Sequence, residues 1–255
     1  MKVLKKVKTG VTRIIQGQFN LIPYHPFSWL PITIEPYEMI FKAMAHNGKT
    51  WFIPVNSKEF ALWAFRFLEA NERFLKILKE GDILAEIGAC TGEYTIPAAQ
   101  KIGKKGKVFA FEADFLGCEC IKKNAQVHRL TNIEVFNEAL SDTIGQKVSL
   151  SIPTNLSGGM ILKARNGSLV TKTLDGCLKN IPIDVLKITV NGHELEVLAG
   201  AQMLLSQVRA IVLQSAWHEE LKKFLEDFGY SVKESINAQD SPEGVKIMLF
   251  ERKIY

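Results

Sequence analysis

The chain has 255 residues, with 47% hydrophobic and 23% charged residues, which is ordinary for a globular protein and excludes disorder as its main state. This length suffices for one large domain, or for a domain with an N-terminal extension. The net charge of +5 comes from one end, because five basic residues and no acidic residue precede Glu35, and the remaining 27 basic and 27 acidic residues balance. A basic nucleic-acid-binding face, and hence a nucleic-acid partner, is not expected.

The basic end, MKVLKKVKTGVTRIIQGQF, has apolar residues at helical spacing with lysines between them. This pattern fits a basic amphipathic helix over residues 1–20 that lies on an anionic membrane surface. It fits equally a helix that packs on the protein's own core or on a second subunit. The segment is too short and too charged to span a membrane, so we expect a cytoplasmic protein, with peripheral membrane contact as an open alternative.

The next stretch, LIPYHPFSWLPITIEP, carries four prolines, which exclude a continuous helix. Residues 1–56 are therefore expected to form an N-terminal extension and residues 57–255 the main domain. That domain begins with a helical pattern over about residues 57–81, which Gly81 ends.

An alternation of short apolar strands and helices follows. The predicted strands are 82–88, 107–113, 133–140, 184–190 and 209–215, and helices are predicted at 93–103, about 114–129, and after residues 192 and 218. Buried strands joined by helices indicate an α/β fold with a parallel sheet covered on both faces. The last two strands, YSVKES and KIMLFERK, lack a helix between them, so one of them should run antiparallel at the sheet edge. A polar, turn-rich segment at about 145–172 is expected to form a hairpin-like insertion.

A cofactor site is predicted where the first two strands end, because ligands bind beyond the carboxyl ends of parallel strands. Gly88 and Gly92 allow a tight turn in EIGACTG, and Glu112, 20 residues further on, can accept hydrogen bonds from ribose hydroxyls. The turn lacks G-x-G-x-x-G, and Glu93 would repel a pyrophosphate at the start of the next helix. S-adenosylmethionine, which has no phosphate, therefore fits better than a dinucleotide.

These segments, together with GKVFAFEAD, NIEVFNEALSD, TKTLDGCL and IDVLKITVNGHELEVLAGA, resemble the FkbM-type methyltransferases, which use S-adenosylmethionine. The resemblance extends over about residues 74–236. It implies a Rossmann-like class I methyltransferase fold, with a seven-stranded, mostly parallel sheet, an antiparallel last strand and helices on both faces. It also implies O-methylation, often of a sugar or another hydroxylated small molecule; a lipid-linked acceptor would account for the basic tail. The cofactor-binding residues that it implies are Glu86, Gly88, Ala89, Cys90, Gly92, Tyr94, Glu112, Ala113, Asn137, Glu138 and Ala139.

The fourth strand departs from the family pattern K-I-D-V-E-G, because Thr189 and Asn191 replace both carboxylates, and Gln214 stands where the fifth strand commonly ends in glutamate. Neither threonine nor asparagine is a base near neutral pH or a strong Mg²⁺ ligand, so no metal site is expected. Thr189 and Asn191 remain candidates for orienting the substrate. His193 and His218, in loops that follow strands, are the candidate bases.

Three function classes remain open. The chain can be a methyltransferase whose substrate needs little base assistance, or a degenerate relative that binds S-adenosylmethionine or a partner without catalysis. A nucleotide-dependent oxidoreductase is disfavoured, since neither G-x-G-x-x-G nor a suitably placed Tyr-x-x-x-Lys is present. The intact cofactor side favours the enzyme. The four cysteines, Cys90, Cys118, Cys120 and Cys177, show no disulfide or zinc pattern and are expected to be free thiols.

Overall fold

The structure is a computed structural model that describes residues 20–25, 28–35, 40–44, 50–54, 74–151, 160–163, 166–237 and 244–252. The helix predicted over residues 1–20 lies outside these ranges except for Asn20, which begins a strand. Most of the helical pattern predicted over residues 57–81 also lies outside the described residues.

A seven-stranded sheet forms the centre of the molecule, in the order β14-β15-β13-β12-β5-β6-β7. The strands are β5 (Ile83–Ile87), β6 (Lys107–Phe111), β7 (Ile133–Phe136), β12 (Val185–Ile188), β13 (Ala210–Ser215), β14 (Tyr230–Asn237) and β15 (Lys246–Arg252). Neighbours from β13 to β7 are parallel, whereas β15 is antiparallel to both β13 and β14. The expected fold class is confirmed, and the antiparallel strand lies one position inside the edge.

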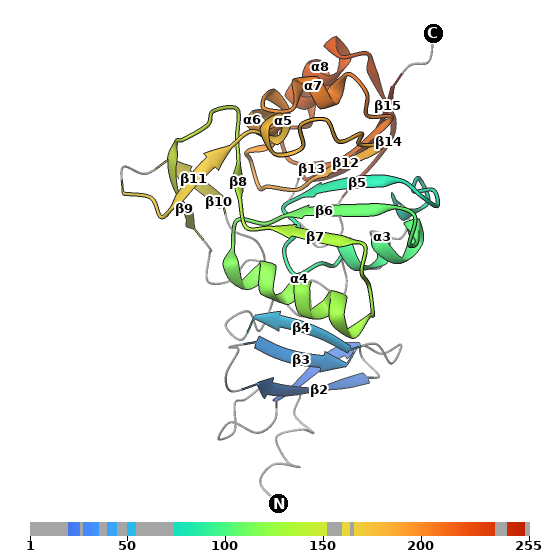
Figure 1. Ribbon diagram of the computed structural model, residues 1–255, viewed down its shortest axis with the longest axis vertical. Coiled ribbons are helices and arrows are strands. Elements are labelled where there is room, and N and C mark those ends of the chain that lie inside the picture. Colours follow the sequence, from blue (N-terminus) through green and yellow to red (C-terminus); the bar gives the residue numbers. More distant parts are fainter. Residues whose placement is uncertain are drawn as a thin grey trace, which may run out of the picture.

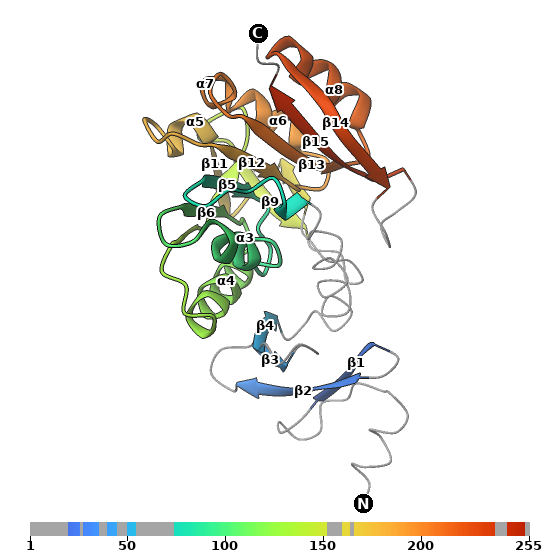
Figure 2. The same ribbon diagram turned by 90° about the vertical axis from the view of Figure 1, so that its right-hand side faces the viewer.

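Helices cover both faces of this sheet (Figures 1 and 2). One face carries α3 (Thr95–Ile102) and α4 (Phe115–Val127), and the other carries α5 (Leu174–Cys177), α6 (Glu194–Ala199), α7 (Gln202–Leu205) and α8 (His218–Asp227). Successive side chains of a strand point to opposite faces of the sheet: Val185 packs with α3, whereas Leu186 and Ile188 pack with α6 to α8. This two-residue alternation explains why the strands read as continuous apolar runs.

A second, smaller sheet is formed by the residues that follow β7. The segment predicted as one strand, 133–140, is divided into β7 and β8 (Ala139–Leu140). The short strand β8 pairs in parallel with β11 (Leu169–Lys172), and β9 (Lys147–Ser151) and β10 (Met160–Lys163) complete the sheet in the order β10-β9-β11-β8. The predicted insertion is therefore a hairpin with one further strand.

The helix predicted after residue 192 is likewise divided, into α6 and α7, on either side of Gly200 and Ala201. A Cβ at Gly200 would lie 2.2 Å from the carbonyl oxygen of Ser141, so the helix end packs directly on the loop after β8. This long-range contact is not visible in the local sequence pattern.

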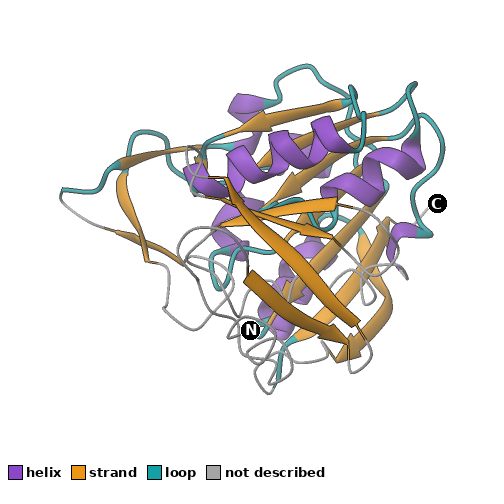
Figure 3. Cartoon of the chain, turned by 90° about the horizontal axis from the view of Figure 1, so that it is seen from below, coloured by secondary structure: helices purple, strands orange, loops and turns teal. Residues whose placement is uncertain are grey.

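The N-terminal extension forms a four-stranded antiparallel sheet of β1 (Asn20–His25), β2 (Ser28–Glu35), β3 (Ile40–Met44) and β4 (Thr50–Pro54). The prolines do exclude a helix, but the strands were not predicted. This sheet stands on the α4 side of the central sheet (Figures 1 and 2), and Figure 3 shows the layers from that side. Within the described residues, no helix has both the length and the hydrophobicity needed to cross a membrane.

Candidate active site

The turn that follows β5 has an unusual backbone. Gly88, Cys90 and Gly92 all have positive φ, of 76°, 54° and 97°. Cys90 is the residue for which this conformation is costly, because a side chain disfavours the left-handed region. Its amide donates a 2.7 Å hydrogen bond to the Glu112 carboxylate, so the strained residue is fixed by a residue at the end of β6.

Glu112 is held from two sides. Its Oε2 accepts from the Cys90 amide, and its Oε1 accepts from the Asp114 amide at 2.8 Å. Burial raises the pKa of Glu112 to about 7, although these two amides act to lower it. A carboxylate has about four acceptor positions. Two of them therefore remain beyond the bonds to the Cys90 and Asp114 amides.

Glu93 is hydrogen-bonded to another residue of the same turn. Its carboxylate accepts from the Thr91 hydroxyl at 2.7 Å and from the Thr91 amide at 3.3 Å, and burial raises its pKa. A phosphate bound at this helix start would need such donors for itself. The turn is therefore unsuited to a pyrophosphate.

The two glycines of the turn make room for protein atoms rather than for a ligand. A Cβ at Gly88 would lie 1.9 Å from the carbonyl oxygen of Thr189, and one at Gly92 would contact Ile96 and Ile121. The side chains of Ala89 and Tyr94 are 1% exposed and belong to the core. Both residues can therefore reach a cofactor only through their backbone.

A buried ion pair links β5 to β12 below this turn. Glu86 and Lys187 are register partners on these neighbouring strands, with Lys187 Nζ 3.0 Å from Glu86 Oε1. Thr95 donates a 2.6 Å hydrogen bond to the other Glu86 oxygen, and Lys187 also donates to Thr189 Oγ1 at 3.3 Å. Lys187 lies 5.1 Å from the centre of the Tyr94 ring. The pair thus places Thr189 beside the cofactor turn.

The loop after β12 is folded around Glu194. This carboxylate, in a residue 2% exposed, accepts from the amides of Val190 and Gly192 and from the hydroxyl of Ser215. Asn191 adopts φ 53° and is exposed at the tip of this loop. Glu194 is therefore engaged in shaping the rim.

The two predicted bases have other partners. His193 Nε2 lies 3.1 Å from Ser141 Oγ, and its Nδ1 lies 3.5 Å from Glu196. His218 Nδ1 lies 3.1 Å from the Ala216 carbonyl oxygen. His193 precedes α6 and makes no side-chain cap on this helix.

The residues predicted at the adenine end lie where β7 ends. Asn137 donates to the carbonyl oxygens of Glu112 and Ala113, both at 3.0 Å, and so braces the end of β6. Glu138 forms a 2.5 Å ion pair with Lys172 of β11. The Ala139 side chain is buried in the second sheet.

Several residues of this site have roles that were not foreseen. A Cβ at Gly117 of α4 would lie 2.6 Å from the Cys90 carbonyl oxygen, so this glycine lets α4 approach the turn. Asn124 of α4 is fully buried and donates to the Thr91 carbonyl oxygen at 2.8 Å. Trp217, 53% exposed, places its ring against Gly192 on the rim. A glycine and an asparagine in the middle of a helix are the only local signals, and neither names its partner.

Comparison with known proteins identifies this arrangement. Residues 86–232, more than half of the chain, match the methyltransferase FkbM domain. This chain belongs to the FkbM methyltransferase family. The match contains the turn after β5, Glu112 and the complete loop after β12.

Individual relatives agree on the class. The chain is 30% identical over 102 residues to a tRNA (guanine(37)-N(1))-methyltransferase of Leishmania braziliensis, which is 39% of this chain and 14% of that protein. It therefore spans a small part of that relative's length. Among solved structures, M. jannaschii TYW2 in complex with AdoMet has a TM-score of 0.54 at 17% identity, over 92% of this chain and 94% of that one. Streptococcus pneumoniae Sp1610 in complex with S-adenosyl-L-methionine has a TM-score of 0.51 at 16% identity, over 74% and 75%. These two structures show the fold.

S-adenosylmethionine is the cofactor of this methyltransferase domain, and the turn fits it. Glu86 in β5, Glu93 in the turn before α3 and Glu112 after β6 place three carboxyl groups around the turn. Lys187 forms its ion pair with Glu86 and also acts to lower the pKa of Glu93. Carboxyl oxygens suit a sulfonium cation. Within the described ranges, no group of three or more His, Cys, Asp or Glu residues is arranged to hold a metal ion.

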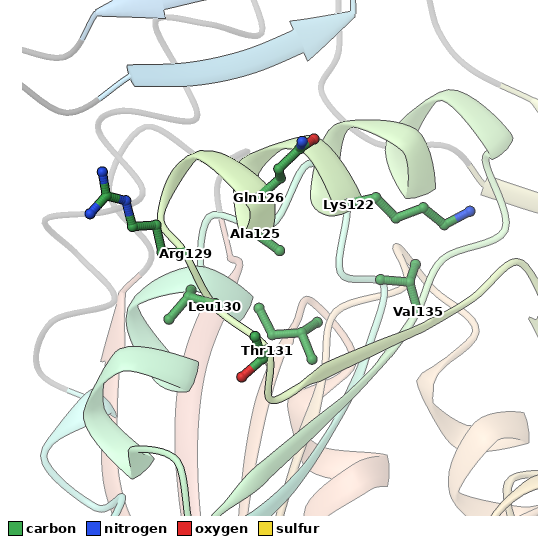
Figure 4. Close-up of a pocket in the computed structure, with 8 residues that line it drawn as sticks. Lys122, Ala125, Gln126, Arg129, Leu130, Thr131 and Val135 are labelled. Carbon is green, nitrogen blue, oxygen red and sulfur yellow. The ribbon is translucent and has the colours of Figure 1, made fainter.

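A separate hollow lies beside α4 and β7 (Figure 4). Lys122, Gln126 and Arg129 stand over an apolar lining that includes Leu130 and Val135. It includes the residues before β7 and the first residue of that strand, whereas the cofactor turn follows the carboxyl ends of the strands. This hollow is therefore not part of the candidate active site.

Proposed function

We propose that the protein transfers the methyl group of S-adenosylmethionine to an oxygen atom of a hydroxylated small molecule or sugar, without a metal ion. The observation that carries this proposal is Glu112, whose two oxygens are fixed by the amides of Cys90 and Asp114 beside the strained turn. A carboxylate in this place can accept both ribose hydroxyls of the cofactor.

In this proposal the other predicted residues serve the cofactor and the acceptor. The backbone amides of Gly88, Ala89, Cys90 and Gly92 donate within the protein, so these residues would offer carbonyl oxygens to the methionine part. Ala113, Asn137, Glu138 and Ala139 would surround the adenine end. Thr189 and Asn191 orient the acceptor on the rim. Because methyl transfer from a sulfonium is an in-line displacement, much of its acceleration comes from such positioning.

An RNA acceptor is the alternative raised by the name of the Leishmania relative. The balanced charge of the chain after its basic end gives no support to it, since RNA binding draws on a concentrated basic surface. The basic end, for which a membrane surface or a lipid-linked acceptor was expected, lies outside the described residues apart from Asn20.

The test is methyl transfer by the purified chain in the presence of EDTA. The chain is incubated with methyl-labelled S-adenosylmethionine and a mixture of small hydroxylated metabolites, and the label is followed in the products. We expect labelled small molecules, and their loss in the Glu112→Ala variant. Cofactor binding without any transfer would favour the degenerate relative instead.

A further inference from the structure

The hydroxyl of Thr189 is directed to act as a hydrogen-bond donor. Lys187 Nζ lies 3.3 Å from Thr189 Oγ1. An ammonium group only donates, so Thr189 Oγ1 is the acceptor of this bond and its own hydrogen is left for another group. The family pattern has aspartate here, which would accept. The substitution therefore exchanges an acceptor for a donor at the rim.

The buried carboxylates near Thr189 are already engaged. Glu86 is 1% exposed and accepts from Lys187 and Thr95. Glu194 is 2% exposed and accepts from two backbone amides and Ser215. Each accepts from charged or multiple donors, and neither is exposed to an incoming acceptor. Neither is therefore placed to remove a proton from it.

The histidines of the two loops also direct both ring nitrogens elsewhere. His193 lies between Ser141 and Glu196, at 3.1 and 3.5 Å. His218 lies between the Ala216 carbonyl oxygen and Glu219, at 3.1 and 3.6 Å, both of which belong to its own segment. Among the described residues around Thr189, the carboxylates and histidines discussed above thus have other partners. The group that Thr189 presents to an acceptor is a hydrogen-bond donor and not a general base.

Chemistry separates acceptors by their need for that base. A hydroxyl that is as weak an acid as water keeps its proton at neutral pH and must lose it during transfer. A carboxylate, with a reference pKa of about 4, is already ionised at neutral pH. A donor such as Thr189 can hold a carboxylate by one oxygen while the other attacks.

We propose that the acceptor enters as a carboxylate, held by the Thr189 hydroxyl that Lys187 orients, and leaves as its methyl ester. This inference rests on the proposed methyl transfer and names its acceptor class: a hydroxylated small molecule or sugar acid that is methylated on its carboxylate. A lone pair of the carboxylate oxygen forms the new bond to the methyl carbon. The carbon–sulfur bond breaks and its electron pair stays on sulfur, which becomes a neutral thioether. The two opposite charges cancel, and no proton is released.

The test follows the stability of the transferred label in alkali. The full chain is incubated with methyl-labelled S-adenosylmethionine and one acceptor at a time. Two pairs compare a carboxylate with a related alcohol: glucuronate with glucose, and benzoate with benzyl alcohol. A mixed metabolite extract is tested as well. Mild alkali releases the label of a methyl ester as methanol and leaves an ether intact. We expect label that alkali releases, whereas alkali-stable label would overturn the inference. Label in no product, despite measurable cofactor binding, would overturn the proposed methyl transfer itself.

Variants at Thr189 separate its role from simple packing. Thr189→Val keeps the shape and removes the donor, so kcat/KM for the carboxylate should fall about tenfold or more while cofactor affinity is retained. Thr189→Ser should restore the rate. A rate with the wild-type chain that is flat between pH 6 and 9 at saturating cofactor agrees with an acceptor that needs no base. Equal rates for Thr189→Val and wild type would contradict the assignment.

Discussion

At the scale of single residues, the site depends on charges and backbone angles that partners from other segments hold in place. The Glu112 carboxylate accepts hydrogen bonds from the amides of Cys90 and Asp114. Cys90 has a left-handed backbone conformation that its side chain disfavours. The sequence predicted an acidic residue at the end of β6, and Glu112 directly follows this strand. The sequence did not reveal the raised pKa of Glu112 or the positive φ of Cys90, because burial and backbone conformation are set only in the folded structure.

The affinity for S-adenosylmethionine should depend on pH through Glu112. Only the carboxylate accepts both ribose hydroxyls, and burial raises the pKa of Glu112 to about 7. Affinity is then nearly complete above about pH 8, falls by about half at pH 7 and by about tenfold at pH 6, because the competent fraction falls. Calorimetric titrations between pH 5.5 and 8.5 measure this dependence. Glu112→Gln should bind weakly with little dependence in this range; an unchanged slope would assign the dependence to another group.

Cys90 offers a prediction about stability. Asparagine tolerates positive φ better than other residues with side chains, whereas a β-branched residue tolerates it poorly. Cys90→Asn should therefore unfold at an equal or higher urea concentration than wild type. Cys90→Val should lose about 1–2 kcal/mol of unfolding free energy. The order is compared in urea at constant pH, and a valine variant as stable as wild type would show that the turn carries no strain.

At the scale of elements, most strands could be predicted from the sequence, whereas the long-range contacts between elements could not. Short apolar runs identified β5, β6, β12 and β13, because a strand buried on both faces is apolar at nearly every position. The two-residue strand β8 and the break at Gly200 depend on contacts with Thr171 and Ser141. Such contacts leave no periodic pattern in the sequence.

Gly117 shows how one helix position controls the cofactor turn. Glycine to alanine within a helix normally stabilises, by about 0.5–1 kcal/mol. A Cβ at Gly117 would lie 2.6 Å from the Cys90 carbonyl oxygen and 2.9 Å from Glu112 Cγ, so Gly117→Ala should instead destabilise the fold and weaken cofactor binding. Thermal unfolding and calorimetry measure the two effects. Gln126→Ala, further along α4, serves as the control that should leave cofactor affinity unchanged.

At the scale of the whole molecule, one buried side chain joins the N-terminal sheet to the methyltransferase domain. Asn124 Oδ1 accepts from the Phe52 amide at 2.6 Å, and its Nδ2 donates to the Phe52 carbonyl oxygen at 3.0 Å. The same nitrogen donates to the Thr91 carbonyl oxygen in the cofactor turn. β4 thus pairs with a side chain in the way it would pair with another strand. Composition indicated an N-terminal extension, but only the structure shows this connection.

Breaking that connection should reach the cofactor turn. Asn124→Ala leaves three buried backbone groups without their partner, so we expect a loss of about 2 kcal/mol or more in unfolding free energy and faster amide exchange in residues 88–93. Phe52→Pro removes the amide donor that faces α4, together with the Phe52 ring that packs against Cys120. It should give an effect of the same kind. Unchanged amide exchange in residues 88–93 for both variants would show that the N-terminal sheet does not stabilise the cofactor turn.

The claim that most needs a direct measurement is that the turn after β5 and Glu112 bind S-adenosylmethionine. Isothermal titration of the full chain with S-adenosylmethionine, with NADH as the comparison and Glu112→Ala as the variant, tests it. We predict micromolar binding of S-adenosylmethionine, no binding of NADH, and a loss of about tenfold or more in the variant. Absence of S-adenosylmethionine binding, or equal affinity in Glu112→Ala, would contradict the account.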